Sequence, residues 1–160
     1  MYTRNSDLTH YKTNRLSTNC GSYALRLNEW YNLDEEFDED IYDWIWQMSE
    51  EGYADWEISN IFRDILLDRM LNEFGSELEV CDGALPTDDN IELIAFNTFC
   101  FVNECNGEAD YDFHFRVFRD GVWKEKCGGD CVRECDMNDW GNYIGEEIYL
   151  YHRLGETNEV

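Results

Sequence analysis

DYDFHFRVFRDGVWKEK, residues 110–126, is the stretch that decides the fold, because it has the pattern of a β-hairpin. Apolar and polar residues alternate along residues 111–117, the period of two that places one face of a strand in a core and the other face outside. Asp120-Gly121 supplies a two-residue turn, in which glycine adopts positive φ without steric cost. The expected inner face carries Tyr111, Phe113, Phe115 and Val117, and the expected outer face carries Asp112, His114 and Arg116.

The register of this hairpin places a histidine beside a carboxylate. If Arg119 pairs with Val122, His114 lies opposite Cys127. Glu125 then falls on the same face as His114, one diagonal step away and within reach of a long side chain. An imidazole held in this way is suited to general acid–base chemistry, so we searched the chain for a nucleophile.

The candidate nucleophile is Cys20, in the segment TNCGSYAL at residues 18–25. Thr18 or Asn19 is a good N-cap, so we expect a helix that runs to about Tyr31. In its first turn, backbone N–H groups and the helix dipole would stabilise a Cys20 thiolate. The alternative is a small buried cysteine that behaves as a hydrophobic residue. The expected core stripe of this helix is Tyr23, Ala24, Leu27, Trp30 and Tyr31.

Asn-Cys-x-x-Tyr-Ala-Leu at residues 19–25, followed far downstream by Asp-Tyr-x-Phe-His-Phe and Asp-Gly-x-Trp, resembles a papain-like cysteine hydrolase family common in phage and bacterial genomes. The resemblance covers residues 18–31 and 91–129. Family members have Asp-Tyr-His-Phe-Tyr-Arg and then Asp-Gly-x-Trp-Ser-His-Lys-Pro-Gly. Here the histidine comes two residues later, the loop to the tryptophan is one residue shorter, Glu125 replaces the second histidine, and Cys127-Gly128 replaces Pro-Gly.

The resemblance implies a papain-like thiol hydrolase of the peptidase or amidase type, of phage or mobile-element origin and with no cofactor. Cys20 would attack a carbonyl, His114 would act as the base, and Glu125 would orient the imidazole. Asp112 and Asp130 are alternatives for the third position. Asn19 or the Cys20 backbone amide would donate to an oxyanion. Peptide, isopeptide and amide bonds all remain open as substrates.

The order of patterns along the chain predicts one α+β domain over residues 1–160, with N-terminal helices packed on a C-terminal antiparallel sheet, as in papain-like folds. We expect helices at about 38–51 and 54–74, and strands at 77–81, 91–102 and 147–151 besides the hairpin. The core stripe of the second of these helices is predicted to include Ile58, Ile61, Phe62, Ile65, Leu66, Arg69 and Met70. Residues 1–17 have no clear period and suggest an arm or an initial strand.

The chain is strongly acidic, with 36 Asp plus Glu against 12 Lys plus Arg and a formal net charge of −24. This charge disfavours nucleic acid, anionic lipid and cell-wall polymers as direct partners and favours basic ones. Residues 34–57 contain eleven acids and no Lys or Arg, so they form either a solvated helical face or a docking surface. The alternative function is therefore a catalytically silent nucleic-acid mimic that binds a basic host protein, such as a nuclease or a defence complex. Its candidate contact residues are Glu35, Glu36, Asp38, Glu39, Asp40 and Asp43.

The seven cysteines are expected to be reduced. The N-terminus has no apolar signal region and no stretch approaches the ~18 consecutive apolar residues of a membrane span, so we expect a cytoplasmic protein with no membrane contact. Cys127, Cys131 and Cys135 are spaced by four, but a zinc site would need a fourth ligand from elsewhere. We therefore expect free thiols and no metal.

Overall fold

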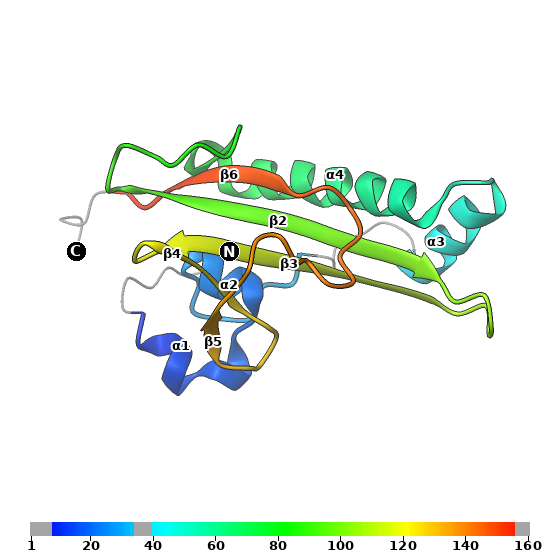
Figure 1. Ribbon diagram of the computed structural model, residues 1–160, viewed down its shortest axis with the longest axis horizontal. Coiled ribbons are helices and arrows are strands. Elements are labelled where there is room, and N and C mark those ends of the chain that lie inside the picture. The colour runs from blue at the N-terminus through cyan, green and yellow to red at the C-terminus, as the bar shows by residue number, and fades with distance from the viewer. Residues whose placement is uncertain (1–7, 34–39, 156–160) are drawn as a thin grey trace.

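A computed structural model describes residues 8–33 and 40–155, and shows helices packed on a six-stranded antiparallel sheet, an α+β arrangement (Figure 1). The strand order is β1-β6-β2-β3-β4-β5. The helices precede β1 in the chain, and none in the described ranges is long and apolar enough to cross a membrane. The elements are α1 (His10–Thr13), η1 (Arg15–Ser17), α2 (Cys20–Leu25), α3 (Ile41–Glu50), α4 (Asp55–Phe74), η2 (Gly75–Glu77), β1 (Leu78–Cys81), β2 (Ile91–Val102), β3 (Ala109–Arg119), β4 (Val122–Lys126), β5 (Val132–Glu134) and β6 (Ile148–Arg153).

The β2–β3–β4 meander forms the centre of the sheet, and its predicted strands and register are confirmed. β2 covers the predicted residues 91–102, and Arg119 pairs with Val122 across the β3–β4 turn. Both central turn residues have positive φ, 57° at Asp120 and 79° at Gly121, as a two-residue hairpin turn of this twist requires. We expected the strand at residues 147–151 to close the sheet as its last strand, but β6 lies inside the sheet, between β1 and β2.

The N-terminal third differs from the prediction in two places. Asn19 caps α2 through a capping box with Ser22, as expected, but the helix ends at Leu25 instead of about Tyr31. Arg26 adopts the left-handed conformation with φ 56°, which terminates the helix without a glycine. Residues 10–17, predicted as an arm or a strand, form α1 and η1.

The two acidic helices lie close to their predicted ranges. The side chain of Asp40 accepts hydrogen bonds from the first backbone N–H groups of α3 and caps it. α4 buries Ile58, Phe62, Leu66 and Met70. Three predicted members of its stripe are not buried, because Ile65 is exposed and Ile61 and Arg69 are half-buried.

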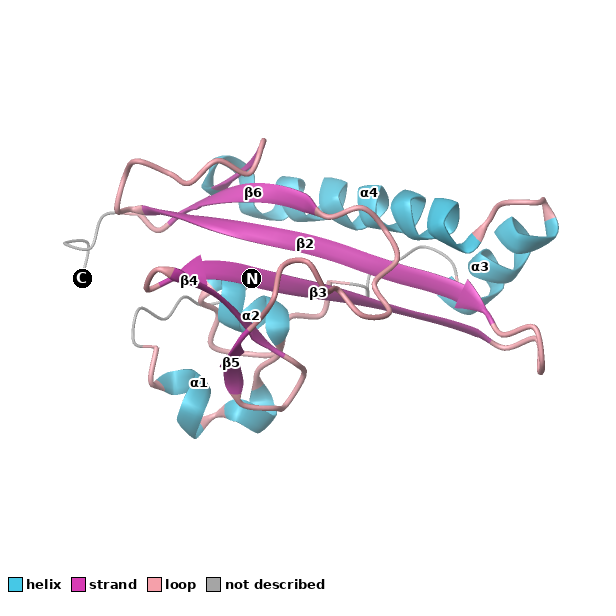
Figure 2. Ribbon diagram, viewed as in Figure 1, coloured by secondary structure: helices cyan, strands magenta, loops and turns pink. Residues whose placement is uncertain are grey.

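The sheet is covered on both faces, and this overturns the prediction of an outer face on β3. The helices pack on one face, and the loop between β5 and β6 crosses the other (Figure 2). His114 and Arg116 are only 4% and 6% exposed as a result. Arg116 donates hydrogen bonds to the carbonyl oxygens of Asp136 and Asp139 and so holds this loop on the sheet. The short strand β5, which leads into the loop, was not predicted.

A buried ion cluster attaches α2 to the sheet. Glu92 on β2 accepts hydrogen bonds from Arg26, at 3.0 Å, and from Arg119, at 2.6 and 2.7 Å. Arg119 also donates to the carbonyl oxygens of Tyr23 and Ala24 in the last turn of α2. Burial raises the pKa of Glu92, but the hydrogen bonds from the two guanidinium groups outweigh burial and hold it at about 2.

We predict that Glu92→Gln lowers the free energy of unfolding by about 3–5 kcal/mol, because it leaves buried Arg119 without its counter-charge. Urea denaturation at neutral pH measures this. Since the pKa of Glu92 is depressed in the fold from 4.5 to about 2, its contribution is complete above pH 4.5 and is lost as the pH falls towards 2. Glu79→Gln is the matched control, because the Glu79–Arg153 pair is exposed. It should change stability by less than about 1 kcal/mol, and an equal loss in both variants would contradict the assignment.

Candidate functional site

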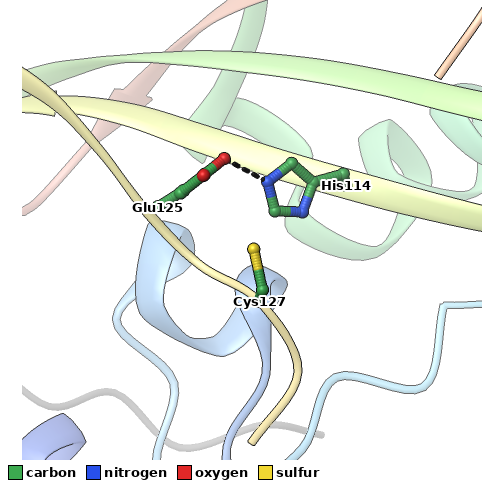
Figure 3. A group of neighbouring side chains, drawn as sticks. All are labelled: His114, Glu125 and Cys127. Carbon is green, nitrogen blue, oxygen red and sulfur yellow. Dashed lines mark hydrogen bonds and ion pairs between the residues drawn. The ribbon is translucent and has the colours of Figure 1, made fainter. Parts of the chain in front are cut away.

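The candidate site centres on His114 of β3 and Glu125 of β4. The β3–β4 register pairs Arg116 with Glu125, so His114 lies diagonally across from the carboxylate, as the sequence predicted. The His114 Nε2 atom lies 2.7 Å from Glu125 Oε1 (Figure 3). No hydrogen bond of the other ring nitrogen, Nδ1, to the described part of the chain is present, so Nδ1 is the atom left for chemistry.

Glu125 is held as a carboxylate by two guanidinium groups and by the imidazole of His114. Besides His114, it accepts hydrogen bonds from Arg116 Nε at 2.8 Å and Arg133 Nε at 2.9 Å. Burial raises the pKa of Glu125, but the hydrogen bonds from His114 and Arg116 outweigh it and hold the pKa at about 2. Glu125 is therefore ionised at neutral pH, and it favours the imidazole form in which Nε2 carries the proton.

Aromatic side chains from the β5–β6 loop fix the plane of the imidazole. The Tyr143 ring stacks on His114 with 5.2 Å between centroids, and Trp140 meets it edge-on at 6.2 Å. The predicted alternatives to Glu125 have other roles. Asp112 accepts a hydrogen bond from the Tyr143 hydroxyl at 3.3 Å, and Asp130 is exposed in the turn after Cys127.

Cys20 is the first residue of α2, as predicted, but its environment does not favour a resting thiolate. The side chain is 5% exposed, and Sγ donates to the carbonyl oxygen of Phe113 at 3.8 Å. Burial raises the pKa of the Cys20 thiol to about 12. The expectation of a thiolate stabilised by the helix N-terminus is wrong, because desolvation of the charged sulfur outweighs the dipole of a helix this short.

One cavity brings the predicted nucleophile and base together. Its volume is about 350 Å³, and both Cys20 and His114 line it. No direct hydrogen bond joins the two side chains within the described residues. The thiol and the imidazole therefore border the same space without contacting each other through a hydrogen bond. Its other lining residues are Asn19, Trp30, Asp112, Phe113, Cys127, Gly128 and Tyr143.

Cys127 is a second thiol at this site, and the sequence analysis assigned it no role. Its Sγ, one nitrogen of His114 and one oxygen of Glu125 all lie within 4.8 Å of one another, and Figure 3 shows the sulfur directed towards the other two groups. Arg133 donates to Cys127 Sγ at 3.3 Å. The hairpin register placed Cys127 opposite His114, so the signal was present in the sequence.

This group of three is a poor cation site. Two guanidinium groups already donate to the Glu125 oxygens, so an added metal ion would lie beside two fixed positive charges. Cys131, which the sequence considered with Cys127 and Cys135 as a zinc ligand, is exposed and lies outside the group.

Lys126 joins the two walls of the cavity and was also missed. Its side chain is fully buried, and Nζ donates to the carbonyl oxygens of Arg15, Thr18 and Gly128. Thr18 lies two residues before Cys20, and Gly128 directly follows Cys127. Burial lowers the pKa of this lysine. The carbonyl cage thus fixes the distance between the two thiol-bearing segments.

Of the six acids predicted to contact a basic partner, the structure describes two. Asp40 caps α3 and Asp43 is exposed in its first turn. Glu35, Glu36, Asp38 and Glu39 lie outside the described residues.

Comparison of the chain with protein-family models, with curated proteins and with solved structures finds no match. The papain-like resemblance therefore stays a prediction from the residues that carry it. The chemistry of the site has to be argued from its geometry.

We predict that Lys126→Met destabilises the protein by roughly 1–3 kcal/mol, because it leaves buried carbonyl oxygens without a donor. Loosening of the cavity walls should also speed alkylation of Cys20 by a small neutral reagent under native conditions, measured by peptide mapping. Lys124→Met is the control, since Lys124 pairs with the exposed Asp120. Unchanged Cys20 labelling in Lys126→Met would contradict the role of Lys126 in holding the walls.

Proposed function

We propose that the protein is a thiol hydrolase of the papain-like type that cleaves a peptide or amide bond, with Cys20 as nucleophile and His114 as general base. The observation that carries the proposal is the shared cavity, in which Cys20 and an imidazole oriented by Glu125 face the same space. The resemblance of residues 18–31 and 91–129 to a papain-like family of phage and bacterial genomes adds to it. On that resemblance we extend the proposal to a cytoplasmic protein of phage or mobile-element origin.

In the proposed reaction, Cys20 Sγ attacks the carbonyl carbon of the scissile bond while His114 Nδ1 takes the thiol proton. His114 then gives this proton to the leaving amine, and a water molecule hydrolyses the acyl-enzyme. Glu125 stays ionised and stabilises the imidazolium that forms between these steps. Because burial keeps the Cys20 thiol neutral at rest, proton transfer accompanies attack and does not precede it.

The oxyanion donor in this scheme is the backbone N–H of Cys20, at the start of α2, where helix N–H groups have no intrahelical partner. The Asn19 side chain, the other predicted donor, is engaged elsewhere. Its Nδ2 donates to the Tyr31 carbonyl, and its Oδ1 accepts from Ser22 N and Tyr31 N. Asn19 is thus a positioning residue that holds the first turn of α2.

The charge of the protein narrows the substrate class. Asp112 lines the cavity, and the chain carries a formal net charge of −24, so an approaching basic peptide is attracted and an acidic one is repelled. We therefore place a peptide segment with Lys or Arg near the cleaved bond.

We predict that Cys20→Ala and His114→Gln each lower the rate of hydrolysis of basic peptidyl p-nitroanilides by about 10²–10⁴-fold. The measurement is release of p-nitroaniline from a panel of Lys- and Arg-containing peptides. Cys131→Ala is the matched control, because Cys131 is exposed and lies outside the cavity, and it should keep full activity. Activity that survives Cys20→Ala would remove Cys20 as the nucleophile.

A second candidate function, capture of a basic protein partner, is favoured by exposed aromatic side chains on the acidic helix α3. Tyr42 and Trp46, one turn apart, are 52% and 43% exposed. Tyr42 lines an open groove of about 550 Å³ whose lining also includes Glu108 and Asp110 and contains no Lys or Arg. An aromatic face beside carboxylates suits a Lys or Arg side chain. In this candidate function the chain acts as a nucleic-acid mimic, and its partner is a basic host protein.

For this candidate we predict that replacing Glu35, Glu36, Asp38, Glu39, Asp40 and Asp43 with Asn or Gln abolishes binding of a fluorescent oligo-arginine peptide in 0.1 M salt. Binding by the unmodified protein should weaken steeply with added salt, since charges are screened within ~10 Å at 0.1 M ionic strength. A control variant removes the same number of charges elsewhere, at Asp68, Asp88, Asp89, Glu134, Glu146 and Glu147. Equal weakening in both variants would show a general charge effect and no docking surface.

A further inference from the structure

Cys127 lies in the cavity beside His114, but it has no role in the proposed hydrolysis. The residue is half-buried and lines the 350 Å³ cavity as well as a second cavity of about 510 Å³, which His114 and Glu125 also line. Cys127 therefore borders both cavities. The His114 side chain beside it is 4% exposed and has Nδ1 free of hydrogen bonds to the described residues.

We propose that Cys127 is a thiolation site, where a small-molecule disulfide forms a mixed disulfide that fills the cavity and covers His114. The site itself stands on the geometry of Cys127, His114 and Arg133. Its consequence, that thiolation switches hydrolysis off, rests on the proposed function.

The exchange balances with the small disulfide as the oxidant. His114 takes the proton of Cys127, and the thiolate attacks one sulfur of the disulfide. A bond forms between Cys127 Sγ and that sulfur, and the original S–S bond breaks. The second half of the disulfide leaves with the electron pair and takes up the proton from His114, so one free thiol is released for each protein modified.

The neighbours of Cys127 stabilise the charge that develops on sulfur. Arg133 donates to Cys127 Sγ at 3.3 Å. Arg116 donates to the neighbouring Glu125 carboxylate. Reactive cysteines are found in partly exposed positions that have basic side chains beside the sulfur. Burial and the neighbouring Glu125 carboxylate nevertheless raise the pKa of Cys127, and Arg133 and Arg116 act against them. The thiol is therefore protonated at rest, and its reaction depends on His114 as the base.

The other cysteines lack this combination. Cys20 and Cys100 are buried, and Cys105 and Cys131 are exposed. Cys81 and Cys135 are half-buried like Cys127, but among the described residues neither belongs to a group such as the one that Cys127 forms with His114 and Glu125. Cys131 is of special use, because it lies four residues from Cys127 and reports the reactivity of an ordinary exposed thiol in the same molecule.

The ligand class follows from charge. The formal net charge of −24 attracts a cationic disulfide to the molecule and repels an anionic one. Cystamine, which carries an ammonium group on each half, is therefore the probe, and neutral hydroxyethyl disulfide separates the local effect from attraction by the whole protein.

The test is the rate of mixed-disulfide formation at Cys127 relative to Cys131, measured by quenched peptide mapping after brief exposure of the full chain to cystamine. We expect Cys127 to react faster than Cys131, and we expect His114→Gln to slow Cys127 roughly tenfold while Cys131 is unchanged. Arg133→Gln should slow Cys127 less. With hydroxyethyl disulfide, mixed-disulfide formation should be slower at both cysteines, but Cys127 should still react faster than Cys131.

Two outcomes would overturn the site. Cys127 reacting no faster than Cys131 removes the argument from its surroundings, and a Cys127 rate that does not depend on His114 removes the base. Unfolding in a variant is recognised because it accelerates all buried thiols, Cys100 included. The Cys20→Ser variant separates this inference from the hydrolase. Thiolation of Cys127 should persist in Cys20→Ser whether or not Cys20 is the nucleophile, and its loss there would contradict an independent site.

Discussion

The structure depends on the Glu125 carboxylate, which is buried at the centre of the β3–β4–β5 half of the sheet. It accepts from His114 and Arg116 on β3 and from Arg133 on β5, so one side chain joins three strands. Arg116 extends the network by holding the carbonyl oxygens of Asp136 and Asp139. A buried anion with this many charge-assisted hydrogen bonds fixes the strand register and the loop together. The imidazole of His114 is oriented as a consequence.

The distribution of charged side chains places several arginines near the candidate site of an acidic chain. Of the carboxylates that the structure describes, most are exposed or half-buried, whereas Arg26, Arg116 and Arg119 are directed inward to Glu92 and Glu125. Lys126 is buried without a carboxylate among its hydrogen-bond partners and is held by carbonyl oxygens. These few basic residues thus organise the interior around the cavity.

The sequence predicted the parts of the fold that follow from local pattern. The alternation in residues 111–117 and the Asp120-Gly121 turn were sufficient for the register of β3 and β4, and the register was sufficient to place Glu125 beside His114. The features that failed are set by distant contacts. α2 ends early because Arg26 adopts the left-handed conformation, and no glycine in the sequence marks this position as a helix end. From there the guanidinium of Arg26 donates to Glu92 on β2.

The local sequence pattern also did not predict which polar side chains are buried. The alternating pattern predicts that the strand face with His114 and Arg116 is exposed to solvent. In the structure the loop at residues 135–147 crosses this face and buries it. The same desolvation reverses the expected direction of the Cys20 pKa, since position at a helix start says nothing about what covers the sulfur. Lys126 reads as an exposed strand residue for the same reason. The sequence thus brought Cys20, His114 and Glu125 forward as candidates but missed Cys127 and Lys126, and the protonation states of all these groups depend on the packing.

The central claim is that the imidazole held by Glu125 serves two thiols with different tasks, acyl transfer at Cys20 and disulfide exchange at Cys127. The most direct measurement is rapid acid quench during the first turnover with an activated ester of a basic amino acid, before water hydrolyses the acyl-enzyme, followed by mapping of the acyl group by mass spectrometry. The account predicts the acyl group on Cys20. An acyl group found on Cys127, or on no cysteine at all, would contradict it.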